Sequence, residues 1–216
     1  MSLIIRNLSD QLVDLVRERV LSGRVPADKA IRQDSLAAEL GISKIPLREA
    51  LFRLEQEGLL QLQANRGFFV RPLSRSEAEE VYALRVKLEP DVIAVAAVRA
   101  TEEEQATAKN VFATLYQMTD EGGDGVGAFN RAFHIALMSP SQLHLTIDIL
   151  KRLQVLSERY VRKHLEPLGR DERANEEHRQ MLETWLARDS EGIRALTEQH
   201  IKSTLDDLTH QLDAGG

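Results

Sequence analysis

Apolar residues in the first sixty positions recur every three or four residues, which is the spacing of an amphipathic helix. The pattern covers 7–22, then a short segment that ends at Gly41, and then a segment that begins after Ser43 and ends at Gly58. Serine is a favourable N-cap, and glycine commonly ends a helix. Three helices are therefore predicted, and the second and third are arranged as a helix-turn-helix.

After the third helix the spacing changes to the alternation of a β-strand, first over 60–62 and then, beyond a turn, up to Phe69. Two such strands joined by a short turn form a β-hairpin, and Arg66 and Gly67 are expected at its tip. Residues 1–72 are therefore predicted to form a winged helix-turn-helix domain.

The third helix has one apolar face and one face that carries cations. Its apolar stripe, expected to be buried, consists of Leu47, Ala50, Leu51 and Leu54. The residues expected to face outward near its start are Lys44, Ile45, Arg48 and Phe52. Cations in the N-terminal half of a helix suit the major groove of DNA. The alternative is an ordinary helical hairpin with a solvated basic face.

From Ser74 onward the spacing is helical throughout, and no segment alternates as a strand does. Ser74 with Glu77 three residues later forms a capping-box pattern, which marks the start of a second domain at 73–216. Breaks in the pattern divide this part into six predicted helices, at 74–100, 102–119, 126–138, 141–165, 171–188 and 190–212. The predicted fold is mainly α, a winged helix followed by an all-α six-helix bundle.

Charge differs between the two predicted domains. The whole chain of 216 residues has a net charge of −6, but residues 1–72 hold 11 Lys+Arg against 9 Asp+Glu. A slightly basic N-terminal part and an acidic C-terminal part indicate different tasks. Cysteine is absent, so thiolate metal sites and disulfides are excluded. Without a signal peptide pattern or an apolar run of ~20 residues, the expected location is the cytoplasm, with no membrane partner.

The run LAAELGISKIPLREALFRLEQEGLL, closed by RGFFV, resembles the N-terminal domain of the GntR family of bacterial transcription regulators. The resemblance implies a double-stranded operator DNA partner, and it implies DNA contacts from Arg32, Ser43, Lys44, Ile45, Arg48, Arg66 and Gly67. Two positions depart from the family pattern. Asp34 stands where many members carry a DNA-contacting arginine, which leaves Arg32 as the substitute contact, and Phe52 stands where a polar residue is usual.

The runs YALRVKLEPDVIAVAAVRA, FNRAFHIALM, NEEHRQML and LTEQHIKST resemble the helical effector domain, called FCD, of the FadR-type branch of the same family. Six helices rather than seven make the chain similar to the VanR-like subgroup. The resemblance implies a homodimer that responds to a small effector.

Three histidines lie within helices among apolar neighbours, at positions 134, 178 and 200. Asn130 lies one helical turn before His134 and on the same face. Imidazoles from three helices that converge in a bundle form a natural site for a divalent metal such as Zn, Ni or Mn. The resemblance adds that metal-binding members usually have aspartate at the position of Asn130, so the amide is expected to be a weak fourth ligand. The alternative is that each histidine is an ordinary core or surface residue.

Arg85 is the candidate effector-binding residue. It matches an arginine that, by the resemblance, lines the ligand cavity of these effector domains, and a planar guanidinium suits a carboxylate effector. The alternative is an ordinary i,i+4 ion pair with Glu89.

Two other functions compete with a ligand-responsive regulator. One is a metal-dependent helical-bundle enzyme, but di-iron bundles need Glu-x-x-His pairs, and the residues three before the histidines are Arg131, Asn175 and Thr197. No HExxH motif or phosphate-binding glycine loop occurs, so no enzyme is expected. The other, a DNA-binding regulator whose bundle only dimerises, stays open. The prediction is a repressor that a small carboxylate metabolite releases from a palindromic operator.

Overall fold

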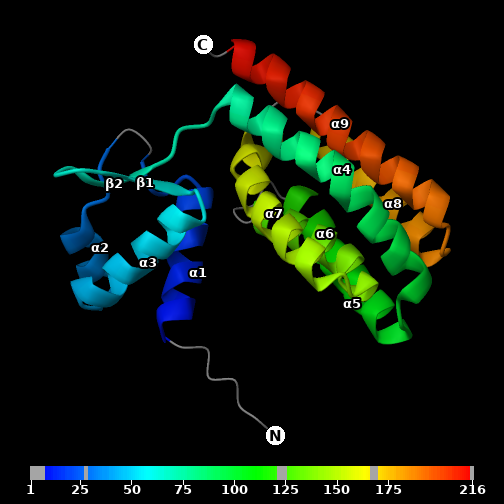
Figure 1. The fold of residues 1–216 in the computed structure, drawn as a ribbon, viewed down its shortest axis with the longest axis horizontal. Helices are drawn as coiled ribbons and strands as arrows, with labels where there is room; N and C mark the ends of the chain where they lie inside the picture. Colours follow the sequence, from blue (N-terminus) through cyan, green and yellow to red (C-terminus); the bar gives the residue numbers. More distant parts are fainter. Residues whose placement is uncertain (1–7, 27–28, 121–125, 166–169, 215–216) are drawn as a thin grey trace, which may run out of the picture. The chain divides into compact units, whose positions relative to one another are not determined.

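A computed structural model describes residues 8–26, 29–120, 126–165 and 170–214 of the chain (Figure 1). The chain divides into two compact units, Met1–Pro72 and Leu73–Gly216. The segment between the predicted helices 102–119 and 126–138, and the segment between 141–165 and 171–188, fall almost entirely outside the described residues.

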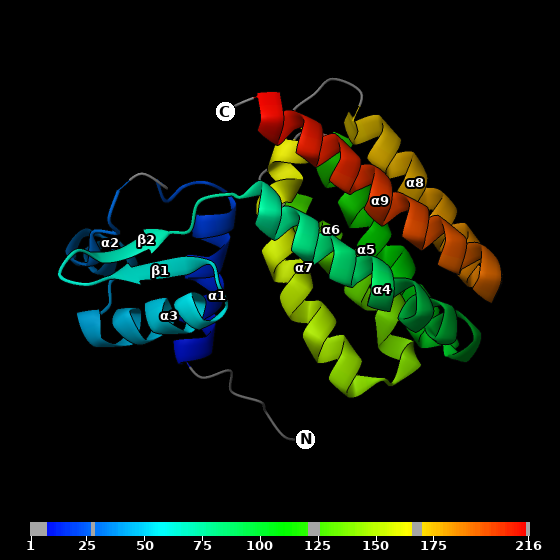
Figure 2. The same ribbon diagram turned by 45° about the horizontal axis from the view of Figure 1, so that its top comes forward.

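The N-terminal unit is a winged helix-turn-helix, as predicted. Its elements are α1 (Leu8–Leu21), α2 (Gln33–Leu40), α3 (Lys44–Gln56), β1 (Leu60–Gln63) and β2 (Gly67–Val70). The strands pair antiparallel, with Leu60 opposite Val70 and Gln63 opposite Gly67. Figure 2 shows α3 running alongside this hairpin, which is the wing, and α3 contacts β1.

The turn between α2 and α3 follows from two residues at the helix ends. Gly41 adopts φ +66°, a left-handed conformation that favours glycine, and its N–H donates back to Ala38. Ser43 occupies the N-cap position of α3 with extended backbone, although its side chain makes no capping hydrogen bond. The predicted apolar stripe of α3 is fully buried, with Leu47, Ala50, Leu51 and Leu54 each 0% exposed.

The expectation that Phe52 faces outward is wrong. Phe52 is half-buried, and its ring packs edge-on against Phe68 of β2, with 5.0 Å between ring centroids. The wing covers this side of α3, so the aromatic side chain packs against β2 instead of facing solvent.

The C-terminal unit is the predicted all-α bundle. Within the described residues its six α-helices are α4 (Arg75–Arg99), α5 (Glu102–Asp120), α6 (Val126–Met138), α7 (His144–Leu165), α8 (Arg170–Leu186) and α9 (Ser190–Ala214). The helix predicted from 141 begins at His144, because Ser139–Ser141 form a 3-10 turn, η1, and Gln142 has φ +58°. In Figures 1 and 2, α4 and α9 lie side by side along the bundle, and α4 also packs against α7.

The start of α4 is fixed by Tyr160 of α7. Ser74 caps the helix by accepting a hydrogen bond from the Glu77 N–H at 3.4 Å, as the capping-box pattern predicted. The Ser74 N–H, however, donates to the Tyr160 hydroxyl at 3.2 Å, and this hydroxyl lies 2.9 Å from the Glu77 carboxylate. The aromatic residue therefore stands between the two partners of the expected box. No helix in the described part of the chain is long and apolar enough to cross a membrane.

Candidate functional site

The start of α3 presents the exposed side chains that the sequence singled out for DNA. Ile45 is 73% exposed, and Lys44 and Arg48 are exposed as well. Lys44 forms an ion pair with Asp34 of α2, which partly neutralises its charge. No carboxylate of the described residues pairs with Arg48, whose guanidinium lies 5.6 Å from the centroid of the Phe52 ring. Arg48 is therefore an exposed cation held by an aromatic ring.

The wing carries a second arginine of the same kind. Arg66 is exposed at the turn of the hairpin, with its guanidinium 5.2 Å from the centroid of the Phe69 ring. Gly67 has φ +93°, so the tip needs a residue without a side chain at this position. Arg32 is exposed at the N-terminus of α2, where the neighbouring Ile31 N–H donates to the Phe68 carbonyl at 2.8 Å.

The second candidate site is a cluster of three histidines inside the bundle. His134 of α6, His178 of α8 and His200 of α9 are all buried, and one ring nitrogen from each lies within 4.8 Å of the others. Their ring centroids are 4.7 to 5.7 Å apart. The structure thus brings together the three histidines that were singled out from their helical context.

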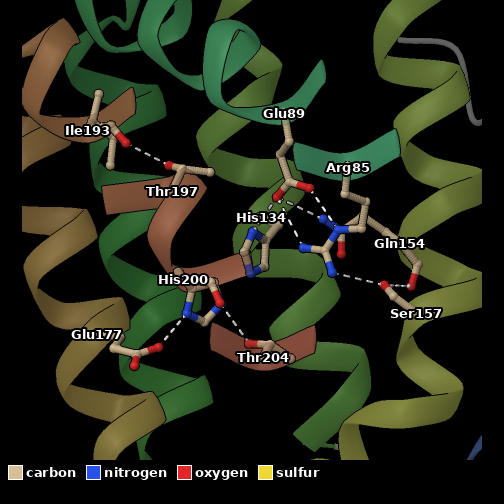
Figure 3. A network of polar contacts seen from close by, with 10 residues as sticks. All are labelled: Arg85, Glu89, His134, Gln154, Ser157, Glu177, Ile193, Thr197, His200 and Thr204. Atoms are coloured by element: carbon tan, nitrogen blue, oxygen red, sulfur yellow. Dashed lines mark hydrogen bonds and ion pairs between the residues drawn. The ribbon is translucent and has the colours of Figure 1, made fainter. Parts of the chain in front are cut away.

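Glu89 of α4 lies beside the cluster and was not singled out as a site residue. One of its oxygens is 2.6 Å from Nδ1 of His134, and the other accepts a hydrogen bond from Nε of Arg85 at 2.9 Å (Figure 3). Gln154 of α7 also donates to Glu89, at 3.0 Å, and Arg85 donates to Ser157 at 3.2 Å. The buried carboxylate therefore joins α4, α6 and α7.

The titration of this group follows from burial and charge. Burial alone would raise the pKa of Glu89, but the Arg85 guanidinium and His134 outweigh it and hold the pKa well below its usual range. Burial lowers the pKa of His134 to about 4, although Glu89 opposes the shift. At neutral pH, Glu89 is ionised and His134 is a neutral imidazole, the form in which histidine binds metals.

A second carboxylate lies beside His200. Nδ1 of His200 is 2.7 Å from an oxygen of Glu177, which belongs to α8 and is 27% exposed (Figure 3). Glu177 stands in the charged run NEEHRQ, where nothing in the sequence distinguishes it from a solvated surface residue. Glu89 did carry a signal, since it lies four residues after Arg85, at the spacing of a helical ion pair.

The histidines border a partly open cavity of about 30 Å³. Polar residues that line it besides the histidines are Tyr82, Arg85, Thr119, Asn130 and Thr204. A volume of this size holds roughly two water molecules. Asn130, the candidate fourth metal ligand, and Arg85, the candidate effector-binding residue, both line the cavity. Arg85 also forms the i,i+4 ion pair with Glu89, which was the alternative role predicted for it.

The residues present suit a divalent metal. Both ring nitrogens of His134 are buried and make no hydrogen bond within the described residues. Nδ1 lies 2.6 Å from Glu89, which leaves Nε2 as the nitrogen available to a ligand. Zinc–nitrogen bonds of ~2.0–2.1 Å put ligand nitrogens roughly 3.3 Å apart. Since the three nitrogens are already within 4.8 Å of one another, modest rotations of the rings would complete such a site.

Comparison with known proteins identifies both units. Residues 8–70 match the family model described as bacterial regulatory proteins of the gntR family, and residues 80–203 match the FCD domain. The uncharacterized HTH-type transcriptional regulator BphR of Paraburkholderia xenovorans is 30% identical over 93% of this chain and 85% of its own length. The Nta operon transcriptional regulator of Aminobacter aminovorans is 36% identical, over a match that spans 60% of each protein.

Among solved structures, Escherichia coli McbR/YncC has the same fold, with a TM-score of 0.82 over 96% of this chain and all of that one, at 22% sequence identity. The matched relatives are named as transcription regulators and not as enzymes. The chain therefore belongs to the GntR family of bacterial transcription regulators, in the branch with an FCD domain, and is a DNA-binding regulator.

Proposed function

We propose that this regulator is a homodimeric repressor that leaves a palindromic operator when a small carboxylate enters the bundle cavity. We further propose that His134, His178 and His200 hold one divalent ion there, such as Zn, Ni or Mn, with Asn130 as a weak fourth ligand. The observation that carries the proposal is the convergence of three buried imidazoles on a small cavity in the effector domain. We also propose that the regulator acts in the cytoplasm, where bacterial DNA lies.

The ligand class follows from the charges around the cavity. A bound divalent ion supplies positive charge and a position open to an oxygen ligand. Three neutral imidazoles and an amide bring no negative charge into direct contact with the ion, which favours an anion as the remaining ligand. Hydroxyl groups of Tyr82, Thr119 and Thr204 line the same space and can donate hydrogen bonds to a carboxylate. Arg85 adds a positive potential, but because its guanidinium already binds Glu89, it contributes as a neighbour and not as a free fork.

On the DNA side, α3 is proposed to enter the major groove, and each protomer is proposed to bind one half-site. Arg48 would contact a guanine edge or an adjacent phosphate. Lys44, Arg66 and Arg32 would contact the backbone, with Ser43, Ile45 and Gly67 close to it. Replacing Arg48 by alanine should weaken operator binding by ~1–3 kcal/mol if the residue contacts a base. Arg53→Ala, which removes an exposed arginine near the other end of α3, is the control. Equal operator affinity of Arg48→Ala and wild type at matched salt would contradict this docking.

Coupling of the two units is proposed to run through α4. Only Leu73 and Ser74 separate Pro72 from this helix, and Arg85 and Glu89 of the same helix reach the cavity network. An effector that binds one arrangement of α4 more tightly would shift the equilibrium by that difference in affinity, typically ~1–3 kcal/mol. Reciprocity requires operator DNA to weaken effector binding by the same factor.

Two measurements test the proposal. Elemental analysis of untagged protein should find about one divalent ion per chain, lost in His178→Gln and kept in His210→Gln, whose histidine is exposed. Small carboxylates that raise the melting temperature of the metal-loaded protein should then be titrated with and without operator DNA. Weaker binding in the presence of DNA is expected. Equal affinities would favour the second candidate function, a DNA-binding regulator whose bundle only dimerises.

A further inference from the structure

Two of the three clustered histidines are held at the same ring nitrogen by a carboxylate. Nδ1 of His134 lies 2.6 Å from Glu89, and Nδ1 of His200 lies 2.7 Å from Glu177. The two carboxylates come from different helices, α4 and α8. Figure 3 shows His134 and His200 between them, with Glu89 on one side and Glu177 on the other.

A carboxylate at Nδ1 decides the chemistry of the other nitrogen. An ionised carboxylate accepts hydrogen bonds only, so a neutral imidazole beside it carries its proton on Nδ1. Its Nε2 then has a free lone pair, which is the form that binds a metal. A hydrogen bond from Nδ1–H to a carboxylate also fixes the ring orientation and makes Nε2 more basic. Nδ1 of His134 lies 2.6 Å from Glu89, whereas Nε2 of this ring is buried and has no hydrogen-bond partner among the described residues.

Glu89 is itself held by hydrogen bonds from its own helix and from α7. Nε of Arg85, one turn earlier on α4, donates to it at 2.9 Å, and Nε2 of Gln154 on α7 donates at 3.0 Å. Glu89 is 0% exposed. Three hydrogen bonds, two from Arg85 and one from Gln154, leave this buried carboxylate a single orientation. Nδ1 of His134 lies 2.6 Å from the carboxylate, so the ring takes its position beside it.

We propose that Glu89 and Glu177 are positioning residues that select the Nδ1-protonated form of His134 and His200, and so direct Nε2 of both rings at a divalent ion. The inference rests on the proposed metal function of the cluster. It assigns a role to two acidic residues outside the ligand set, and it makes the ion-binding strength of the cluster depend on α4, the helix that follows the DNA-binding unit.

Metal competition titrations on the full-length protein test the proposal. Glu89→Gln and Glu177→Gln should each bind Zn(II) and Ni(II) roughly ten- to a hundredfold more weakly than wild type, because outer carboxylate partners of ligating histidines have effects of this size. Glu77→Gln is the matched control. It removes another arginine-paired carboxylate of α4, whose partners are Arg159 and Tyr160, and it should leave the metal affinity unchanged.

A nitrogen-15 NMR spectrum of the histidine rings in metal-free protein gives a readout that a general loss of packing would not produce. Wild type should show His134 and His200 protonated at Nδ1, and each glutamine variant should change the proton distribution of its own histidine only. If Glu89→Gln fails to fold, Glu177→Gln, which alters a partly exposed carboxylate, still carries the test.

The outcomes separate this inference from the metal proposal. Wild-type metal affinity together with unchanged ring protonation in both glutamine variants would overturn the inference and leave the metal site standing. A wild-type protein that binds neither Zn(II) nor Ni(II) would overturn the metal proposal. In that case the NMR spectra of the metal-free proteins still show whether Glu89 and Glu177 determine which ring nitrogen of His134 and His200 carries the proton.

Discussion

Phe52 of α3 packs edge-on against Phe68 of β2, with ring centroids 5.0 Å apart and ring planes at 84°. The guanidinium of Arg48 lies over the same Phe52 ring. Phe68 in turn accepts a backbone hydrogen bond from Ile31, the neighbour of Arg32. One aromatic pair therefore joins the α3 helix, the wing and the start of α2, which are the three elements that carry Arg48, Arg66 and Arg32.

Replacing Phe52 by leucine should weaken operator binding and lower the free energy of unfolding. The aromatic pair and the cation–π contact of Arg48 are each worth about 0.5–1.5 kcal/mol, so a loss of about 1–2 kcal/mol in stability is expected. Urea unfolding measures the stability, and fluorescence anisotropy with operator and with random DNA measures binding. Operator affinity should fall more than affinity for random DNA, because Arg48 loses its fixed position.

Phe52→Tyr is the control for this change, since it keeps the ring. It should bind operator as wild type does. If Phe52→Leu kept full discrimination between operator and random DNA, the ring would be a packing residue with no part in positioning Arg48.

Asp34→Asn should strengthen DNA binding. Asp34 pairs with Lys44 in the free protein, so removing its charge frees a cation at the start of α3 and removes an anion that repels phosphate. The slope of log affinity against log salt should become steeper by about 0.9 for one added lysine–phosphate contact. Asp10→Asn removes the same charge from the ion pair with Arg53, farther along α3, and should change the slope less. Equal effects of the two variants would mean that only net charge matters.

The helices of this protein follow from its sequence because their apolar residues repeat at one spacing, as the stripe from Leu47 to Leu54 does. The ends of the helices are harder to predict. Gln142 adopts φ +58° after a 3-10 turn, and no property of glutamine predicts that conformation, so the start of α7 was placed too early. Helical spacing predicts an exposed Phe52, because that spacing gives no information on where the wing packs. In the structure the wing covers the ring.

In the candidate site, too, features that depend on nearby residues are predictable from the sequence, and contacts between distant elements are not. The mid-helix context of His134, His178 and His200 marked all three, and the fold brings them together. Arg85 had two readings that its sequence neighbours could not separate, because both an ion pair with Glu89 and a place at the cavity need the same face of α4. Glu177 carried no signal, since its contact with His200 depends on how α8 packs against α9.

Arg85→Met should destabilise the protein by ~3–5 kcal/mol, because it leaves the buried Glu89 carboxylate without its guanidinium. Methionine keeps much of the side-chain volume, so lost charge and not a cavity is what the variant tests. The double variant Arg85→Met, Glu89→Gln removes both charges and should recover part of the loss. Urea unfolding of the three proteins at neutral pH measures this. If Arg85→Met lowered the free energy of unfolding by less than about 1 kcal/mol, the Arg85–Glu89 ion pair would contribute no more than an exposed ion pair does.

Stability at high pH should depend on Tyr160. Burial raises the pKa of its hydroxyl to about 12, and the Glu77 carboxylate acts in the same direction. In the unfolded chain the hydroxyl ionises near its ordinary value of 10.0. Between these values the unfolded chain loses a proton that the folded protein keeps, so the free energy of unfolding falls as pH rises from 10 towards 12. Two pKa units correspond to at most ~3 kcal/mol.

Urea unfolding of wild type and Tyr160→Phe at pH 8, 9, 10 and 11 separates this effect from that of the other ionisable groups. The variant should be less stable than wild type at pH 8, because the Ser74 N–H loses its acceptor. Above pH 10 the gap between the two proteins should narrow, since only wild type has the hydroxyl to ionise on unfolding. Tyr116→Phe, which alters an exposed tyrosine, should keep a constant gap to wild type. A constant gap for Tyr160→Phe as well would mean that the Tyr160 hydroxyl ionises alike in the folded and unfolded chain. Burial and the Glu77 carboxylate would then not hold the proton in place.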